Sequence, residues 1–558
     1  MRFVPKYKAA VVQFEPVLFE KDRNIERLEA LVEEAARNGA RLVVTPEMAT
    51  TRYCFTSRRE IEPFVEPIPG PTTRRFGEIA ARWSSYIVVG LPEVDEATGL
   101  FYNSAALVGP SGDVVGKYRK VHSFFDETSW AKDGDLGFPV FDTELGRIAM
   151  VICMDADFFE SVRVAALKGA DVVAFLTNWV SRAPARSWRC RALENGVYFL
   201  AADRWDSERG TRFGGGSCVI DPRGTVIAGI DRGDGVVYAE IDVKRARDKH
   251  IEGFGDLMHC RRPSEYHAVL TNSYLWQPRM ISRLPGGRRS GLGIIQFVPE
   301  EGKPGANLAR IAALLEGLCN AGEQAGIHMG LVVLPELCLT GIVPAVEMGA
   351  LAEPIPGPST ERLAGLAAEF DAHLVVGIAE RQGERVYNSA VLIGPDEVEG
   401  VYRKVHLNEY DSKWASGGDL GLPCFDIPAG RIGLLIGSEM MVPEVPRSLA
   451  KKGADVLAVP SAWPWMEWDF VWSERAANND CYLALANQGG IADACCSVIY
   501  GNPEAREAAK LKDEEGYAFL SIVTEQDSFC RRKEMLRKVQ PTWYDPIVRE
   551  FRTRADGA

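Results

Sequence analysis

The chain has 558 residues, of which 46% are hydrophobic and 25% are charged, so a largely disordered chain is excluded. At about 150 residues per domain, this length predicts two to four domains. The formal net charge of −13 argues against a nucleic-acid partner and against docking on an anionic membrane. No apolar run reaches the length of a membrane span, so we expect no membrane-embedded segment.

The cysteine, histidine and N-terminal patterns point to a cytoplasmic protein without a metal centre. The opening MRFVPKYKAAVVQF contains neither a charged-then-apolar leader nor a small-residue cleavage site, so we predict no secretion signal. Twelve cysteines are too few for a disulfide scaffold in a chain of this length, and no Cys-x-x-Cys pair with metal-ligand spacing occurs. The seven histidines are scattered and form no zinc motif.

Strands and helices are predicted to alternate through the first half of the chain. In order, the patterns predict a strand at 9–14, a helix at about 24–38, a strand at 41–45, a helix at about 73–84, a strand at 86–90, a strand pair at 104–109 and 114–117, and a strand at 147–153 that leads into a helix. This alternation predicts an α/β fold. The run IAMVIC is apolar on both sides, which indicates a sheet buried on both faces.

Several motifs occur twice in the same order, so the chain is a tandem repeat. These pairs are EPIPGP at 66–71 and 353–358, YNSA at 102–105 and 387–390, YRKVH at 118–122 and 402–406, and LVVTPE ending at Glu47 with LVVLPE ending at Glu336. Between the copies lies a basic stretch with Pro and Gly-Gly and little apolar periodicity. We therefore predict a first copy over residues 1–275, a linker over 276–289 and a second copy over 290–558.

Three residues of the first copy stand where α/β proteins place reactive groups, at the ends of strands. Glu47, Lys120 and Cys153 supply a carboxylate, an ammonium group and a thiol. The carboxylate can remove the thiol proton, the thiolate can attack a carbonyl or nitrile carbon, and the cation can stabilise the oxyanion. The backbone N–H of Met154 offers a second oxyanion donor. Singly, these residues are more often a capping acid, a surface lysine and a buried apolar cysteine.

The sequence motifs around these residues resemble those of the nitrilase, or carbon–nitrogen hydrolase, superfamily. They are VVTPE, YRKVH and GRIAMVICMD, followed by LKGADVVAFLTNW and RALENGVYFLAADR. The resemblance covers nearly all of the first copy and, more weakly, all of the second. It implies an α/β fold of two tandem four-layer α-β-β-α sandwich domains, packed as an internal pseudo-dimer.

The resemblance also implies roles for individual residues. Glu47 is then the general base, Lys120 the oxyanion-stabilising cation and Cys153 the nucleophile. Glu127 matches a further family glutamate that positions the lysine and the substrate, whereas from the sequence pattern alone it would be an exposed loop acid. The candidate substrate-binding residues are Asn178, Trp179, Tyr53 and Met154, with core packing as the alternative for the aromatic pair. Hydrolysis by these groups implies no cofactor and no metal.

The second copy lacks the nucleophile, because Gly437 stands at the position equivalent to Cys153. Ser438 lies one residue late and would face the other way at a strand end, so we do not expect it to replace the cysteine. Glu336 and Lys404 remain, and Asp411 stands in place of Glu127. We favour a structural ion pair, since removing one buried partner costs about 3–5 kcal/mol, over a ligand pocket without turnover. The second copy is then a pseudo-domain that replaces a partner subunit.

The leading hypothesis is a cysteine-dependent amidohydrolase that acts on a small linear amide or N-carbamoyl compound. True nitrilases tend to carry Trp-Glu after the nucleophile, whereas this chain has Met154-Asp155. A nitrilase and a non-catalytic binding or scaffold protein remain as alternatives. Arg52, Arg182, Arg186 and Arg204 either bind a substrate carboxylate or are solvated loop residues. Association into a further homo-oligomer stays open.

Overall fold

The computed structural model describes residues 5–273, 287–490, 496–501, 506–512, 515–525 and 534–551. The chain forms two compact units: unit 1 contains Met1–Lys249 with Thr542–Ile547, and unit 2 contains His250–Pro541 with Val548–Ala558. The predicted copies assigned 250–275 to the first half and 542–547 to the second. The two divisions differ because sequence similarity marks where a copy begins, whereas packing decides which core holds its last residues. Most of the predicted linker lies outside the described residues.

Unit 1 contains two six-stranded sheets. The first has the order β14 (Gly235–Asp242), β1 (Lys6–Gln13), β2 (Leu42–Val44), β3 (Tyr86–Val94), β4 (Phe101–Val108) and β5 (Val114–Arg119). The second has the order β13 (Val226–Ile230), β12 (Ser217–Ile220), β9 (Tyr198–Ala202), β8 (Val172–Leu176), β7 (Gly146–Ile152) and β6 (Val140–Thr143). The central strands of each sheet are parallel, and the outer strands are antiparallel.

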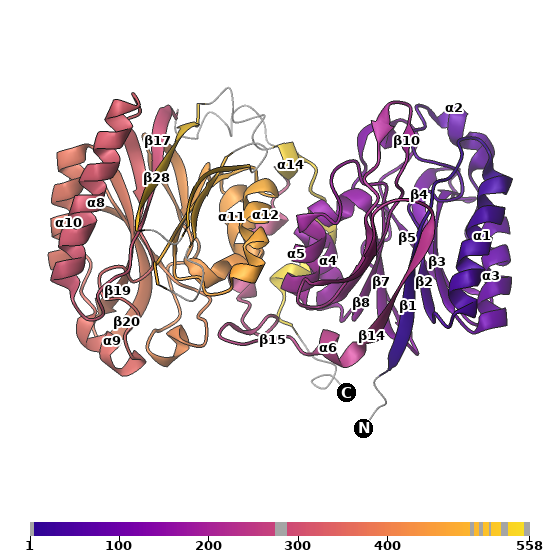
Figure 1. Cartoon of the computed structure of the whole chain (residues 1–558), viewed down its shortest axis with the longest axis horizontal. Coiled ribbons are helices and arrows are strands. Elements are labelled where there is room, and N and C mark those ends of the chain that lie inside the picture. Colours follow the sequence, from indigo (N-terminus) through magenta and orange to yellow (C-terminus); the bar gives the residue numbers. More distant parts are fainter. Residues whose placement is uncertain are drawn as a thin grey trace. The chain divides into compact units, whose positions relative to one another are not determined.

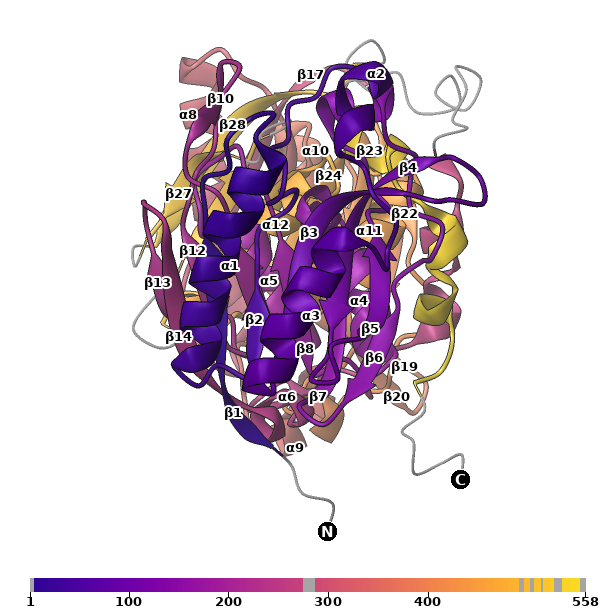
Figure 2. The same cartoon turned by 90° about the vertical axis from the view of Figure 1, so that its right-hand side faces the viewer.

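Helices cover the outer face of each sheet, which gives unit 1 four layers (Figure 1). Helices α1 (Lys21–Arg37) and α3 (Pro71–Trp83) lie over the first sheet (Figure 2), and α4 (Phe159–Leu167) and α5 (Arg186–Asn195) lie over the second. Helix α1 buries Ile25, Leu28 and Val32, whose spacing puts them on one helical face. Strands β7, β8 and β9 are almost wholly buried because sheet packs on one face and helix on the other.

Each six-stranded sheet of unit 2 has the same strand order as the corresponding sheet of unit 1. The first runs β21 (Val398–Arg403), β20 (Arg385–Ile393), β19 (His373–Gln382), β18 (Met329–Val333), β17 (Arg289–Gln296) and β28 (Gly516–Val523). The second runs β22 (Cys424–Ile427), β23 (Gly430–Leu434), β24 (Val456–Ser461), β25 (Tyr482–Asn487), β26 (Ser497–Tyr500) and β27 (Glu507–Leu511). Helices α8 (Pro304–Gln324) and α10 (Pro358–Phe370) cover the outer face of the first sheet (Figure 1). Helices α11 (Glu444–Lys451) and α12 (Phe470–Ala477) cover the outer face of the second sheet. The predicted tandem sandwich fold is confirmed.

The predicted elements agree with the observed ones except near their ends. The strand expected at 86–90 extends through Val94, because β4 pairs with it along its whole length. The helix expected directly after Cys153 begins later: a short 3-10 helix, Cys153–Asp157, comes before α4.

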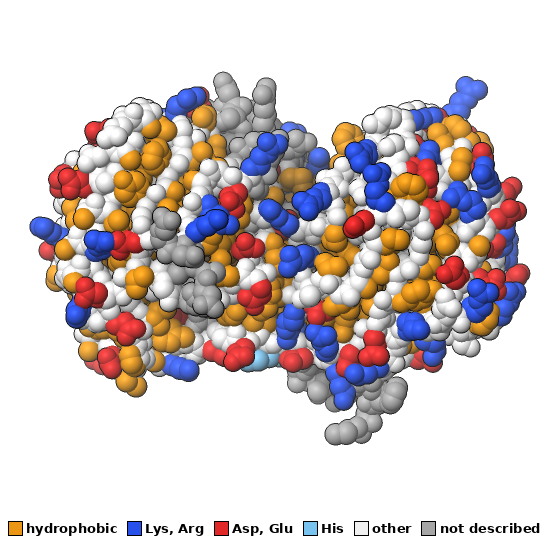
Figure 3. Space-filling model, viewed as in Figure 1, with side chains coloured by type: hydrophobic (Ala, Val, Ile, Leu, Met, Phe, Trp, Pro, Cys, Tyr) orange, Lys and Arg blue, Asp and Glu red, His pale blue; other side chains and the backbone are white. Residues whose placement is uncertain are grey.

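Acidic and basic side chains are interspersed on the face drawn in Figure 3. Among the described residues, no helix combines the length and apolarity that a membrane span needs.

Candidate active site

The buried cluster of unit 1 is formed by residues that follow three strands. Glu47 lies just beyond β2, Lys120 directly follows β5, and Cys153 directly follows β7 in the other sheet. The Lys120 ammonium group donates to Glu47 Oε1 at 2.8 Å and to Glu127 Oε2 at 2.6 Å. All four side chains are buried. The fold therefore brings the four predicted catalytic residues into one cluster.

Asn103, in the middle of β4, links the two carboxylates of this cluster. Its side-chain nitrogen lies 2.7 Å from Glu47 Oε1 and 2.5 Å from Glu127 Oε1. One amide therefore holds one oxygen of each glutamate, while Lys120 binds both. No role for Asn103 is predicted from the sequence. The available signal was its place in the repeated YNSA motif, which gives unit 2 the equivalent Asn388.

Burial and mutual charge set the protonation states of the cluster. Burial raises the pKa of Glu47, and Lys120 only partly offsets this effect. Burial alone would lower the pKa of Lys120, but Glu127 and Glu47 outweigh it and keep that pKa above the ordinary value. Burial, with the Glu47 charge, raises the pKa of the Cys153 thiol well above its ordinary value. The thiol therefore needs a base to ionise it, and the Lys120 ammonium group stays charged.

The two Glu47 oxygens have different surroundings. Oε1 accepts hydrogen bonds from Lys120 and Asn103, whereas Oε2 is buried without a hydrogen-bond partner among the described residues. The Glu47 charge acts directly on the Cys153 thiol. An acceptor oxygen without a partner, in the same buried cluster as a protonated thiol, is suited to act as a general base.

Cys153 has a backbone conformation that is costly for a residue with a side chain. Its φ is +46°, in the left-handed region. The carboxylate of Asp155, two residues later, accepts a hydrogen bond from the Ile152 N–H at 2.9 Å and so closes the turn around the cysteine. The turn holds the sulfur at a fixed place after β7.

The four predicted substrate-binding residues have different environments. Asn178 follows β8 and is buried, and neither its side-chain nitrogen nor its oxygen has a hydrogen-bond partner among the described residues. The Tyr53 ring lies 5.5 Å from the Lys120 nitrogen, and its hydroxyl donates to the Phe124 carbonyl. Met154 is buried beside Cys153. Trp179 packs edge-on against Phe175 and Trp188, which favours the packing alternative for this residue.

Two of the four candidate arginines are committed to carboxylates of the protein. Arg204 is buried and donates to Asp206 Oδ1 at 2.5 Å and to Glu208 Oε2 at 2.7 Å. Arg52 pairs with the same Asp206. Glu208 also accepts hydrogen bonds from the backbone of Tyr53 and Cys54, so this ion-pair cluster anchors the loop that carries Tyr53. Arg182 and Arg186 are exposed.

Unit 2 keeps the charged cluster, and its glutamate occupies the space where a side chain at position 437 would begin. Lys404 donates to Glu336 Oε1 at 2.8 Å and pairs with Asp411 at 2.6 Å, and Asn388 donates to both carboxylates. Glu336 Oε2 accepts a hydrogen bond from the Ala462 N–H at 3.0 Å. A Cβ atom at Gly437 would lie only 2.4 Å from this oxygen. The second cluster is therefore closed by its own carboxylate.

A second difference between the two units lies directly after β8 in unit 1 and after β24 in unit 2. Trp179 in unit 1 and Trp463 in unit 2 are equivalent. The backbone N–H of Trp179 donates to Asp203, which directly follows β9, and that of Trp463 donates to Asn487, the last residue of β25. The preceding residue is Asn178 in unit 1 and Ala462 in unit 2. The unpaired buried amide thus accompanies the cysteine and is absent where the cysteine is absent.

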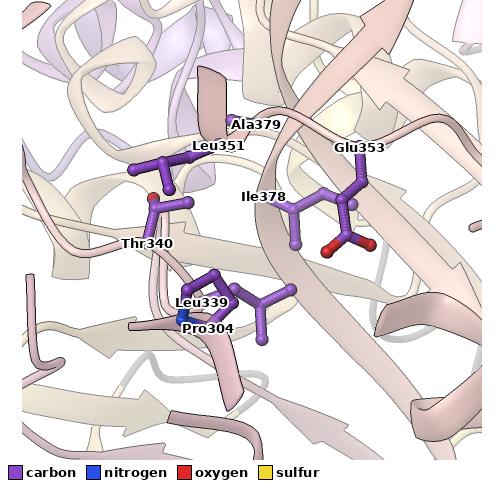
Figure 4. Close-up of a pocket in the computed structure, with 7 residues that line it drawn as sticks. All are labelled: Pro304, Leu339, Thr340, Leu351, Glu353, Ile378 and Ala379. Atoms are coloured by element: carbon purple, nitrogen blue, oxygen red, sulfur yellow. The ribbon is translucent and has the colours of Figure 1, made fainter. Parts of the chain in front are cut away.

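A small pocket in unit 2 lies away from the predicted site residues (Figure 4). It is lined by Pro304, Leu339, Thr340, Leu351, Glu353, Ile378 and Ala379. Both Glu353 oxygens accept hydrogen bonds from Ser359, so the charged side chain of this pocket is already satisfied. Within the described ranges, no group of three or more His, Cys, Asp or Glu side chains could hold a metal ion.

Comparison with known families decides the identity of the repeat. The model of the carbon-nitrogen hydrolase family matches residues 8–250 and, separately, residues 292–522. The chain belongs to the carbon–nitrogen hydrolase family. The double match confirms the predicted tandem duplication within the nitrilase superfamily. Members of this family hydrolyse carbon–nitrogen bonds other than peptide bonds, which agrees with the coarse reaction class predicted from the sequence.

Relatives carry both nitrilase and amidase names. A protein named nitrilase from Pyrococcus abyssi is 41% identical over 261 residues, covering 46% of this chain and 98% of that protein. The omega-amidase NIT2 of Homo sapiens is 30% identical over 254 residues, covering 43% of this chain and 90% of that protein. The crystal structure of Saccharomyces cerevisiae Nit3, a member of branch 10 of the nitrilase superfamily, is 27% identical and covers 43% of this chain and 92% of that one, with a TM-score of 0.40.

Replacing Asn103 by Ala tests its link between the two carboxylates. We expect kcat/KM to fall by about tenfold to a hundredfold, because both glutamates lose a fixed donor and the Lys120 geometry loosens. Asn388→Ala makes the same change in unit 2 and serves as the matched control. Both variants should lose about 1–3 kcal/mol of stability in urea unfolding, but only the first should lose turnover. Equal activity losses would contradict a role for Asn103 in the unit 1 site.

Restoring a cysteine at position 437 tests whether unit 2 is closed. In the double variant Cys153→Ala, Gly437→Cys, we expect ammonia release no higher than in Cys153→Ala alone. The new side chain would collide with Glu336 Oε2, and Ala462 supplies no counterpart to the Asn178 amide. Turnover above the single-variant blank would show that the second cluster is an open site that has lost only its nucleophile.

Proposed function

We propose that the chain is a cysteine-dependent amidohydrolase that cleaves a non-peptide C–N bond of a small linear amide or N-carbamoyl compound and releases ammonia. The observation that carries this proposal is the arrangement of the buried cluster: Glu47 Oε2 has no hydrogen-bond partner among the described residues, its charge acts on the Cys153 thiol, and Lys120 is held on the other oxygen. This arrangement supplies a base, a nucleophile and a cation in one water-poor cluster.

In the first half of the reaction, Glu47 Oε2 accepts the proton of the Cys153 thiol. The thiolate then attacks the substrate carbonyl carbon, and a C–S bond forms as the C=O electrons move onto oxygen. Lys120 and the Met154 N–H stabilise this oxyanion. When the carbonyl reforms, Glu47 returns its proton to the leaving nitrogen, the C–N bond breaks and ammonia departs. The acyl group stays on Cys153 as a thioester.

In the second half, water replaces ammonia. Glu47 takes one proton from the water, the hydroxide oxygen attacks the thioester carbon, and the C–S bond breaks. The proton returns to the sulfur, so the free enzyme is regenerated with the acid as second product. The raised pKa of Glu47 suits this role, because a carboxyl group that holds a proton during each half-reaction must not be a very weak base.

The surroundings of the cluster support a small and largely neutral acyl group. Arg52 and Arg204 are neutralised by Asp206 and Glu208, so neither is free to bind a substrate carboxylate. Asn178 offers an amide donor and acceptor that have no hydrogen-bond partner among the described residues, which suits a substrate carboxamide. Tyr53 supplies an aromatic wall next to Lys120.

The direct test is an ammonia-release screen over matched amides, N-carbamoyl compounds and nitriles that share one acyl group, with the Cys153→Ala protein as the blank. We expect release from amides or N-carbamoyl compounds in the wild-type protein and none in the variant, which should remain folded. Loss of the nucleophile should lower the rate by a factor on the order of 10⁴ or more.

The same screen separates the alternatives. Ammonia released from nitriles only, with none from the matched amides, would replace the amidase proposal with a nitrilase. An unchanged rate in Cys153→Ala would overturn the cysteine mechanism. No turnover on any member of the panel, together with tight binding of one of them, would favour the non-catalytic binding protein.

A further inference from the structure

The far end of the chain provides part of the unit 1 core. Unit 1 includes Thr542–Ile547, which lies outside the residues matched by the family model. Tyr544 is fully buried, and its hydroxyl lies 2.9 Å from His122 Nε2. Its neighbour Trp543 packs so closely on Gly137 that a Cβ atom there would lie 2.8 Å from the indole. The segment is thus fitted into unit 1 and does not lie loosely on its surface.

His122 connects the loop of Lys120 with the turn of Cys153. It stands two residues after Lys120, and its Nδ1 lies 2.7 Å from Asp155 Oδ1, two residues after Cys153. Its ring also stacks on Phe158 at 4.0 Å. Asp155 additionally accepts hydrogen bonds from the Tyr118 hydroxyl and, as noted above, from the backbone of the cysteine turn. Movement of the His122 ring would therefore shift both catalytic loops.

The tyrosine hydroxyl completes the hydrogen bonding of this imidazole. Since the Asp155 carboxylate can only accept, the hydrogen on Nδ1 is donated to it. When Nε2 carries no hydrogen it is an acceptor, and the Tyr544 hydroxyl, 2.9 Å away, is placed to donate to it. Without this hydroxyl, the buried Nε2 atom would lose its hydrogen bond to Tyr544. The ring would then be held through its nitrogens only by the contact between Nδ1 and Asp155.

We infer that Tyr544, contributed by the end of the chain, is a positioning residue for the Glu47–Lys120–Cys153 site: its hydroxyl fixes His122, which holds the Lys120 loop and the Cys153 turn in register. This inference rests on the proposed function. The residue comes from a segment that follows the second family match in sequence but belongs to unit 1 in the structure.

Unit 2 contains the same arrangement and so offers a matched control. There Tyr266, within a Pro-x-x-Tyr sequence like that of Tyr544, lies 2.6 Å from His406 Nε2. His406 Nδ1 lies 2.9 Å from Glu439, two residues after Gly437. The two tyrosines have equivalent contacts, but only the one in unit 1 adjoins a cluster that contains a cysteine.

The test compares Tyr544→Phe with Tyr266→Phe in the full-length protein. We expect Tyr544→Phe to lower kcat by about tenfold with KM nearly unchanged, since it disturbs the reacting groups more than substrate contacts. Tyr266→Phe should leave kcat and KM at their wild-type values. Both should lower the thermal unfolding midpoint to a similar extent. In parallel, the rate of Cys153 alkylation by iodoacetamide, followed by peptide mass mapping, should change in Tyr544→Phe only.

The outcomes distinguish failure of this inference from failure of the proposed function. If the wild-type protein turns over an amide and Tyr544→Phe has the same kcat and the same alkylation rate, Tyr544 is only a packing residue. Equal kcat losses in both variants would likewise overturn the inference, because they would reflect general destabilisation. If the wild-type protein turns over nothing, the proposed function fails, and the alkylation rates still decide whether Tyr544 positions Cys153.

Discussion

The structure of unit 1 depends on one buried interaction, the ammonium group of Lys120 held between two carboxylates. Two negative charges and one positive charge in a desolvated cluster leave an excess of negative charge, which favours uptake of a proton. The Cys153 thiol in the same cluster carries an exchangeable proton, and Glu47 Oε2, which has no hydrogen-bond partner among the described residues, can receive it. The double sheet exists, in functional terms, to hold these groups dry and close together, since their attraction is strong only away from water.

The two repeats show which parts of this cluster are structural and which accompany the sulfur. Glu336, Lys404, Asn388 and Asp411 form nearly the same ion-pair network without a cysteine, so the network is a stable element of the fold in its own right. In unit 2, the carboxylate oxygen corresponding to the free oxygen of Glu47 is bound by a backbone N–H. The favoured sequence interpretation, a structural ion pair, agrees with this closed geometry. What sets unit 1 apart is the combination of thiol, free oxygen and unpaired Asn178 amide.

The sequence predicted the fold and the core of the site because both follow from local patterns. Glu47, Lys120 and Cys153 each follow a recognisable strand, and α/β folds place reactive groups at strand ends, although the structure draws these three residues from two facing sheets. Glu127 required the family resemblance, since its loop has no periodicity. Asn103 was missed because a polar residue inside a strand gives no sign of which loops it faces. Tyr544 could not be paired with His122, because the two are 422 positions apart and neither hydropathy nor spacing encodes such a contact.

The central claim is that the acyl group passes through the sulfur of Cys153 and through no other residue. The most direct measurement is intact-mass analysis of the full-length protein after acid quenching during turnover of an amide, followed by peptide mapping. We predict a mass increase equal to one acyl group, located on the peptide that contains Cys153 and absent from Cys153→Ala. An acyl group on any peptide of the second repeat, or one that persists in Cys153→Ala, would contradict it.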